Sequence, residues 1–184
     1  MKYFFITAIV FACIFSAVAQ NKPVFRSQLD VGISAGDKET GLNLSAVNGF
    51  RMAGWYAGLG VGLDQYRYRT VPLFLSVQKN FSKKPSSVYY FLDGGTNFFW
   101  DHIDNNSWLE RSFDPGWYTA TGLGYRLGWK GRREALLLNA GYAFKRIREN
   151  RSQTVPCLVP PCPQSNDRYQ YDLNTWIFRM GLEF

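Results

Sequence analysis

The chain has 184 residues, the size of one domain, and it carries 21 Lys and Arg against 14 Asp and Glu, a formal net charge of +7. Apolar residues make up 46% and aromatic residues 17%, while charged residues reach only 19%, a balance that excludes a disordered chain and a long-helix protein. One His and three Cys leave little material for a metal site or a cysteine nucleophile, and the basic residues form no stripe that would indicate a nucleic-acid partner.

The N-terminus predicts an export signal. A lysine at the start precedes an apolar run over residues 3–16, and Ala17-Val18-Ala19 fits the small-x-small cleavage pattern. The alternative is an N-terminal membrane anchor, for which the run is short. We predict a cleaved signal peptide over residues 1–19 and one mature domain over residues 20–184.

Apolar residues in the mature chain recur with period two, which indicates β-strands. Between residues 55 and 64, every second residue is apolar, and the residues between them are mainly glycine. The same alternation predicts eight strands, at residues 25–36, 41–50, 54–64, 70–81, 87–98, 115–127, 134–147 and 169–184.

The expected connections alternate in length. Those after the second, fourth and sixth strands are short, whereas the loops Phe99–Asp114 and Arg148–Arg168 are long. Short turns on one rim and longer loops on the other are typical of outer-membrane barrels. We predict an all-β fold, an eight-stranded antiparallel up-and-down transmembrane β-barrel with both termini on the periplasmic side.

Glycine decides which face of each strand points inward. Most strand glycines share the polar parity, and glycine on an exposed strand face would weaken the strand without benefit. On a crowded inner wall, glycine makes room for large neighbours such as Tyr56, Tyr89, Phe91 and Tyr118. We therefore expect the glycine and charged face inside and the apolar face against lipid. The alternative is a soluble lipocalin-like barrel with the apolar face inside.

Charged residues of both signs fall on the expected inner face, four of each: Arg26, Arg126, Lys145, Arg179, Asp30, Asp64, Asp93 and Glu183. Antiparallel pairing of the first and last strands could place Arg26 opposite Glu183 and Asp30 opposite Arg179. Because buried charges require partners, we predict a plug of ion pairs rather than a pore. The alternative is that some of these charges lie in water at the rims, and Asp64 and Lys145, near strand ends, are the first candidates for that position.

The C-terminal strand carries a resemblance to a known family. Every second residue of this strand is apolar and is expected to face outward, and the last of them is aromatic. These residues are Trp176, Phe178, Met180, Leu182 and Phe184. With the signal peptide, this pattern resembles the outer-membrane β-barrel superfamily, and most of all the small OmpA/OmpX-type barrels. The resemblance implies that this strand is the signal read by the barrel-assembly machinery, and that the protein lies in the outer membrane of a diderm bacterium.

The two long loops hold the candidate recognition residues, which are Trp100, His102 and Trp108 in the first. In the second, Cys157 and Cys162 stand among prolines, and export favours a disulfide between them over two free thiols. Arg67 and Arg69, on the same rim, could contact the anionic sugars of lipopolysaccharide. No surface partner can be named from these residues.

The sequence therefore predicts a non-enzymatic outer-membrane barrel without cofactor or metal, with a structural or surface-interaction role through its loops and with membrane lipid as a partner. Two alternatives stay open. One is the soluble exported barrel binding a small hydrophobic ligand. The other is an outer-membrane lipid-modifying enzyme using His102, although no motif ties Ser107 or Ser112 to that histidine.

Overall fold

A computed structural model describes residues 22–37, 39–82, 84–101, 109–129, 134–154, 157 and 163–184. All helical or strand structure in these residues is β-strand, and within them there is no helix long and apolar enough to cross a membrane. The predicted signal peptide, residues 1–19, lies outside the described residues and stays a prediction.

The described part of the chain forms nine strands. They are β1 (Val24–Ala35), β2 (Thr40–Met52), β3 (Trp55–Asp64), β4 (Thr70–Asn80), β5 (Ser87–Phe99), β6 (Leu109–Asp114), β7 (Gly116–Gly128), β8 (Ala135–Thr154) and β9 (Gln164–Glu183).

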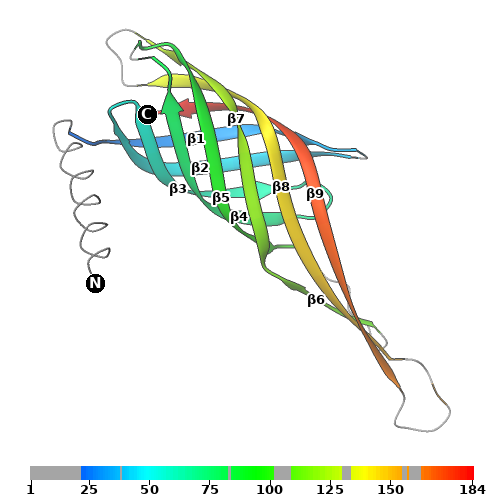
Figure 1. Ribbon diagram of the computed structural model, residues 1–184. Helices are drawn as coiled ribbons and strands as arrows, with labels where there is room; N and C mark the ends of the chain where they lie inside the picture. The colour runs from blue at the N-terminus through cyan, green and yellow to red at the C-terminus, as the bar shows by residue number, and fades with distance from the viewer. Residues whose placement is uncertain are drawn as a thin grey trace, which may run out of the picture.

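Eight of these strands close into an antiparallel ring (Figure 1). The order around the ring is β1, β2, β3, β4, β5, β7, β8 and β9, and β9 pairs back onto β1. The remaining strand, β6, lies beside the outer part of β8. Because each ring strand has a hydrogen-bonded neighbour on both sides, the ring itself has no open edge. The eight predicted strands are those of the ring, and their bounds differ from the prediction by a few residues except at β8 and β9.

The two rims of the ring differ. At the terminal rim, where β1 begins and β9 ends, the backbone amide of Ser27 donates to the carbonyl oxygen of Phe184 over 3.0 Å. The turn between β2 and β3 lies on the same rim, and its two central residues, Ala53 and Gly54, have φ of 50° and 82°. Two positive φ angles in a two-residue turn suit the twist of a tight hairpin. This turn is short, as predicted, but the four-residue connection between β1 and β2 on the opposite rim is also short, so the two rims do not differ in this respect along the whole ring.

At the opposite rim the prediction of two long loops is wrong in part. Residues 148–168 were expected to form a loop, but β8 continues to Thr154 and β9 begins at Gln164, and the two strands pair over their whole length. The other expected loop contains β6, which pairs with β8. Polar residues occupy both faces of these segments, so the apolar alternation disappears although the ladder of backbone hydrogen bonds continues.

We call the three-stranded sheet beyond this rim the extension. It consists of β6, residues 146–154 of β8 and residues 164–172 of β9. Figure 1 shows β8 and β9 running far past the ring, away from the C-terminus.

The side chains alternate strictly between the two faces of the ring. On the outer face, Leu59 and Trp117 are 63% and 64% exposed, and each ring strand contributes large exposed hydrophobic residues. On the inner face, Tyr56 and Asp93 are buried at 1% and 2% exposure. The predicted assignment of faces, polar inside and apolar outside, is confirmed in the structure.

Glycines make room for the large inner side chains, as predicted. A Cβ atom on Gly124 would overlap the ring of Tyr89, and Cβ atoms on Gly122 and Gly141 would come within 2.9 and 2.8 Å of the ring of Phe91. A side chain at any of these positions would displace an aromatic ring that fills the interior. The glycines are therefore part of the packing of the inner wall.

Candidate functional site

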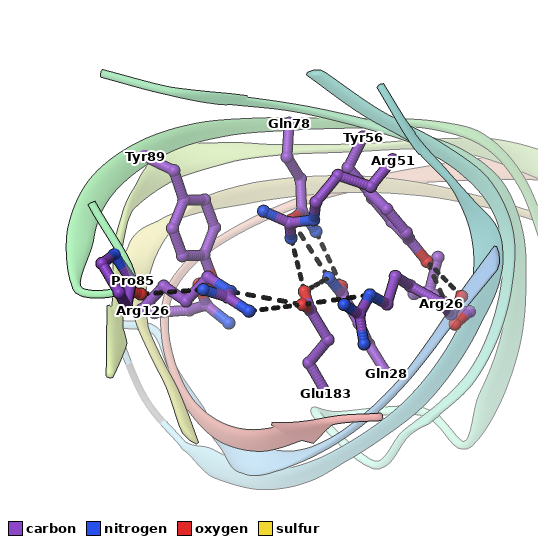
Figure 2. Close-up of polar contacts among 11 residues, drawn as sticks. Arg26, Gln28, Arg51, Tyr56, Gln78, Pro85, Tyr89, Arg126 and Glu183 are labelled. Atoms are coloured by element: carbon purple, nitrogen blue, oxygen red, sulfur yellow. Dashed lines mark hydrogen bonds and ion pairs between the residues drawn. The ribbon is translucent and has the colours of Figure 1, made fainter. Parts of the chain in front are cut away.

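The interior of the ring holds charged groups at three levels, and the nearest to the terminal rim centres on Glu183 (Figure 2). The fully buried carboxylate of Glu183 forms ion pairs with Arg51 and, over 3.0 Å, with Arg126. Gln28 also donates a hydrogen bond to it over 3.1 Å. The arginines come from β2 and β7, so this carboxylate joins distant parts of the ring wall.

Two further side chains complete this level. The Nε atom of Arg26 lies 4.0 Å from a Glu183 oxygen, at the outer limit of an ion pair. Gln78 donates to the side-chain oxygen of Gln28 over 2.8 Å. Figure 2 shows these side chains pointing from opposite walls toward the middle of the ring. We call Glu183, Arg26, Arg51, Arg126, Gln28 and Gln78 the Glu183 cluster.

The middle level is the pair Asp93 and Arg179. The guanidinium Nη1 lies 3.4 Å from the carboxylate of Asp93, and Nη2 lies 3.5 Å from the hydroxyl of Tyr118. Asp30 stands beside this pair and accepts a hydrogen bond from Asn139 over 3.3 Å. The buried charges at this level are therefore held by opposite charges and by hydrogen-bond donors.

The register of β1 and β9 corrects one prediction. Gln28, rather than Arg26, lies opposite Glu183, and Gly32, rather than Asp30, lies opposite Arg179. The ladder is shifted by two residues from the predicted one. A shift of two keeps every side chain on its face, so the inward set is unchanged while the partners change.

The third level is the pair Asp64 and Lys145. The sequence left open whether these two charges lie in water at the rims, and in the structure they are 5% and 3% exposed and form an ion pair over 3.1 Å. The ammonium of Lys145 also donates to the backbone oxygen of Tyr66 over 2.8 Å. The segment that carries Tyr66 folds over the end of the ring and removes this pair from water.

Beyond the ring, the extension is built around a second buried carboxylate, Glu149. Arg111 of β6 donates to it over 2.6 Å, Arg151 over 3.1 Å, and the hydroxyl of Tyr171 on β9 over 3.1 Å. These donors belong to the three neighbouring strands, so the contacts hold the extension together. We call these four residues the Glu149 cluster.

These contacts shift the ionisation of the extension. Burial opposes the charged form of Glu149, but the hydrogen bonds from Arg111, Arg151 and Tyr171 outweigh burial and hold the pKa of Glu149 below its usual value. Burial, together with its hydrogen bond to Glu149, raises the pKa of Tyr171 to about 12. Glu149 is therefore an anion and Tyr171 a neutral donor at neutral pH.

Aromatic side chains pack between the ring of strands and the extension. Phe99 and Phe113 stack with centroids 3.7 Å apart and planes 5° apart. Tyr68 lies 6.0 Å from Phe113 and 5.7 Å from Tyr171. This packing fixes the base of the extension on the end of the ring.

The remaining predicted site residues fall into two groups. The outward residues of the C-terminal strand are all exposed, from 50% at Phe178 to 60% at Trp176, and Trp100 is 64% exposed on the extension rim. His102, Trp108 and Cys162 lie outside the described residues, so their roles and the pairing of Cys157 stay predictions.

Sequence reasoning missed several members of the two clusters. The predicted strand ended at Phe50, so Arg51 fell in the following turn. Arg51 is two residues after the inward-facing Gly49, and continuing the alternation by one step would have placed it inside the ring. Gln28 and Gln78 are neutral, so a count of charges passed over them. Glu149 lay in a segment interpreted as a loop, where no parity was assigned.

The arrangement neutralises buried charge and fills space. Within the described residues no group of three or more His, Cys, Asp or Glu side chains could hold a metal ion. Glu183, Asp93 and Asp64 each lie beside an arginine or a lysine, which is the arrangement of structural ion pairs.

Comparison with known proteins identifies the fold. No family model and no curated protein matches the chain. Among solved structures, the chain is similar to a major outer membrane protein from Thermus thermophilus, with a TM-score of 0.50 and 14% sequence identity. The match covers 88% of this chain and 99% of that chain. At this identity the likeness shows a shared fold, which is found in a bacterial outer membrane protein.

Proposed function

We propose that this chain is an integral outer-membrane β-barrel protein of a diderm bacterium, similar to the small OmpA/OmpX-type barrels and exported by residues 1–19. Its interior is plugged, and it acts without catalysis, through the extension and the loops that the extension carries. One observation supports the proposal most strongly: charged pairs are buried inside the ring, and large hydrophobic residues are exposed around its whole outer face.

Water is a poor solvent for this outer face. Soluble monomers rarely expose continuous apolar patches larger than a few hundred Å². Here Leu59, Leu75, Leu123 and Phe178 are all at least half exposed, on strands distributed around the ring. A lipocalin-like barrel would need the apolar face inside, where this ring holds Asp93, Arg179 and Glu183. The soluble alternative is therefore not favoured.

The dimensions of the ring suit a bilayer. Strands β3, β4 and β5 have 10, 11 and 13 residues, close to the length that a tilted strand needs to cross the hydrocarbon core. Exposed aromatic residues mark both ends of the outer face. Phe25 and Phe50 form an edge-to-face pair near the terminal rim, and Trp117 and Trp176 lie nearer the extension. Such belts are typical of membrane interfaces.

The interior supports a plug rather than a channel. An eight-stranded barrel is just wide enough for side chains to fill. The Glu183 cluster, the Asp93–Arg179 pair and the Asp64–Lys145 pair occupy successive levels. We expect no discrete conductance steps in planar bilayers.

The extension is the proposed interaction surface. It carries the loop 155–163, where we propose a disulfide between Cys157 and Cys162. Among the described strands, the edge of β9 from residue 164 to residue 175 has no partner, since β1 pairs with β9 from Trp176 onward. Such an edge offers free backbone donors and acceptors to a partner strand. Lipopolysaccharide contacts of Arg67 and Arg69, on the same rim, belong to this proposal.

Two parts of the proposal rest on the sequence. The outward residues Trp176, Phe178, Met180, Leu182 and Phe184 are proposed as the signal for the barrel-assembly machinery. His102 is proposed as a loop residue without a catalytic role. An enzyme would instead require that His102→Ala abolish lipid turnover while the barrel still folds.

Gel migration tests the barrel. Mature protein refolded in detergent is compared before and after boiling, and cell fractions are probed for the protein. We expect faster migration of the unboiled protein and its recovery in the outer-membrane fraction. Equal migration, with a protein that stays dispersed in plain buffer, would overturn the proposal.

Labelling of intact cells tests which rim faces outward. In a background with Cys157 and Cys162 replaced by Ser, Ser165→Cys places a thiol on the extension and Ser82→Cys places one on the terminal rim. We expect a membrane-impermeant maleimide to label Ser165→Cys in intact cells, and Ser82→Cys only after lysis. The reverse pattern would invert the orientation.

A further inference from the structure

A groove runs over the outer face of the ring, across β3, β4, β5 and β7. It has a volume of about 420 Å³, and its walls include Leu73, Leu75 and Trp117. One end of the groove reaches Arg148 on β8, where the extension begins. The groove is thus apolar along its length and carries a cation at one end.

Gly94 forms the floor of this groove. It faces outward between Leu75 of β4 and Thr119 of β7. A Cβ atom built on Gly94 would meet nothing within 4 Å, whereas one on the neighbouring Gly95 would overlap the backbone of Leu73. The absence of a side chain at Gly94 therefore serves no inward packing, and it leaves space on the outer face.

Arg148 is a cation without a partner in the part of the chain that the structure describes. Its cross-strand neighbour Asp114 accepts a hydrogen bond from Asn150 over 2.9 Å instead. By contrast, the nearby Arg146 is paired with Asp172 over 2.7 Å. Arg148 is half-buried, so its guanidinium is available to an anion held against the barrel wall.

The height of Arg148 matches a lipid headgroup. Arg148 lies opposite Asp114, three residues from the outward Trp117. Three residues of strand span about 10 Å, and less along the membrane normal because barrel strands tilt. Trp117 marks the membrane interface in the proposed function, so Arg148 lies just above it, at the depth of phosphate groups.

We propose that this groove binds one phosphorylated lipid of the leaflet at the extension rim. An acyl chain lies over Gly94 between the leucines, and the phosphate accepts hydrogen bonds from the guanidinium of Arg148. An arginine can donate two parallel hydrogen bonds to a phosphate, which makes it a selective partner for that group. The inference rests on the proposed function, since it needs the outer face to be in lipid.

Native mass spectrometry tests the proposal. Protein refolded in a neutral detergent is mixed with didecanoyl phosphatidic acid, with the diacylglycerol of the same chains, or with glycerol phosphate. We expect one phosphatidic acid to be retained, and neither of the other two molecules. Retention of glycerol phosphate would show that the site binds free phosphate. Retention of diacylglycerol equal to that of phosphatidic acid would show that Arg148 does not contribute to binding. Either result overturns the proposal.

Variants locate the site. Arg148→Gln should weaken retention of phosphatidic acid by about tenfold or more, the value of one charge-assisted contact. Gly94→Leu should also weaken retention, because its side chain fills the space that the acyl chain would take. Arg148→Lys should keep most of it. The matched controls are Arg168→Gln, on the extension, and Ala57→Leu, on the outer face toward the terminal rim. Equal retention in Arg148→Gln, or an equal loss in the controls, would contradict the assignment.

The boiled and unboiled migration of the same samples separates two failures. A protein that shows the heat-dependent shift and retains no lipid disproves the lipid site alone. A protein that shows no shift disproves the membrane barrel, and the lipid site with it.

Discussion

Two fully buried carboxylates, Glu183 and Glu149, show how the same chemistry works in two regions of the molecule. Glu183 lies inside the closed ring, and its arginine partners come from β1, β2 and β7, around the circumference. Glu149 lies in the open extension, and its partners come from β6, β8 and β9, which are neighbours in one small sheet. The Glu183 cluster therefore joins distant walls, whereas the Glu149 cluster joins adjacent strands.

The partners also differ in their access to water. The side chains of Arg51 and Arg126 are 16% and 13% exposed, against 29% and 33% for Arg111 and Arg151. When a charged side chain inside the ring loses its partner, water cannot take the place of that partner. In the extension, water can solvate the arginines. The comparison predicts large effects in the ring and local effects in the extension.

The largest effect is expected for Glu183→Gln. This change leaves the arginines of the Glu183 cluster without their counter-charge in a closed interior, which costs about 3–5 kcal/mol. Urea unfolding of the refolded protein in lipid vesicles, followed by the boiled and unboiled gel shift, measures it. A midpoint equal to that of the unaltered protein would show that the cluster does not stabilise the ring.

A double change inside the ring sharpens this point. Arg179→Met alone strands the carboxylate of Asp93 and should destabilise the ring by about 3 kcal/mol or more. Arg179→Met combined with Asp93→Leu removes both charges and should recover most of that loss, because buried pairs can be replaced by apolar groups of similar size. The same unfolding assay compares them. A double variant no better than the single one would argue against simple charge compensation.

In the extension, Glu149→Gln should act locally. Loss of the charge weakens three hydrogen bonds, and we expect the extension to open more easily by about 1–2 kcal/mol. Hydrogen exchange should increase in residues 147–154 and 164–171 and stay unchanged in the ring. A loss of ring stability similar to that in Glu183→Gln would erase the distinction between the two regions.

Acid should also loosen the extension, because Glu149 then loses its charge. The folded pKa of Glu149 lies below its usual 4.5, so the ionised form stabilises the extension above that value. This stabilisation is lost as the pH falls through the folded pKa. A spin label on Ser165→Cys, with Cys157 and Cys162 replaced by Ser, should become more mobile only as the pH falls below 4.5. The control is the same label in the Glu149→Gln variant, where this pH dependence should vanish.

The smallest effect on stability is expected when an ion pair on the surface of the extension is removed. Arg146 and Asp172 form an exposed pair over 2.7 Å. Exposed pairs contribute little because water and salt screen them. Arg146→Gln should leave both the hydrogen exchange of the extension and the unfolding midpoint of the ring unchanged. A clear loss in either measurement would mean that the extension depends on surface charge more than on the Glu149 cluster.

The same contrast explains how far the sequence could be interpreted. In the ring, the outer face is apolar and the filled interior is polar, so alternate residues have opposite polarities, and strand positions and inward faces were predictable. The partners were not, because a shift of two residues in the ladder keeps the pattern while it exchanges Arg26 for Gln28 opposite Glu183. In the extension both faces meet polar surroundings, so β6 and the outer halves of β8 and β9 carried no alternation to detect.

The central claim is that the apolar face of the ring meets lipid and the charged face is sealed inside. The most direct test is a spin-label scan along β9 from Trp176 to Leu182, one label at a time, in the protein inserted into vesicles. We expect accessibility to oxygen, which dissolves in lipid, to peak at Trp176, Phe178, Met180 and Leu182. It should be low at Ile177, Arg179 and Gly181. Oxygen accessibility that peaks at the second set, or that shows no period of two, would contradict the account.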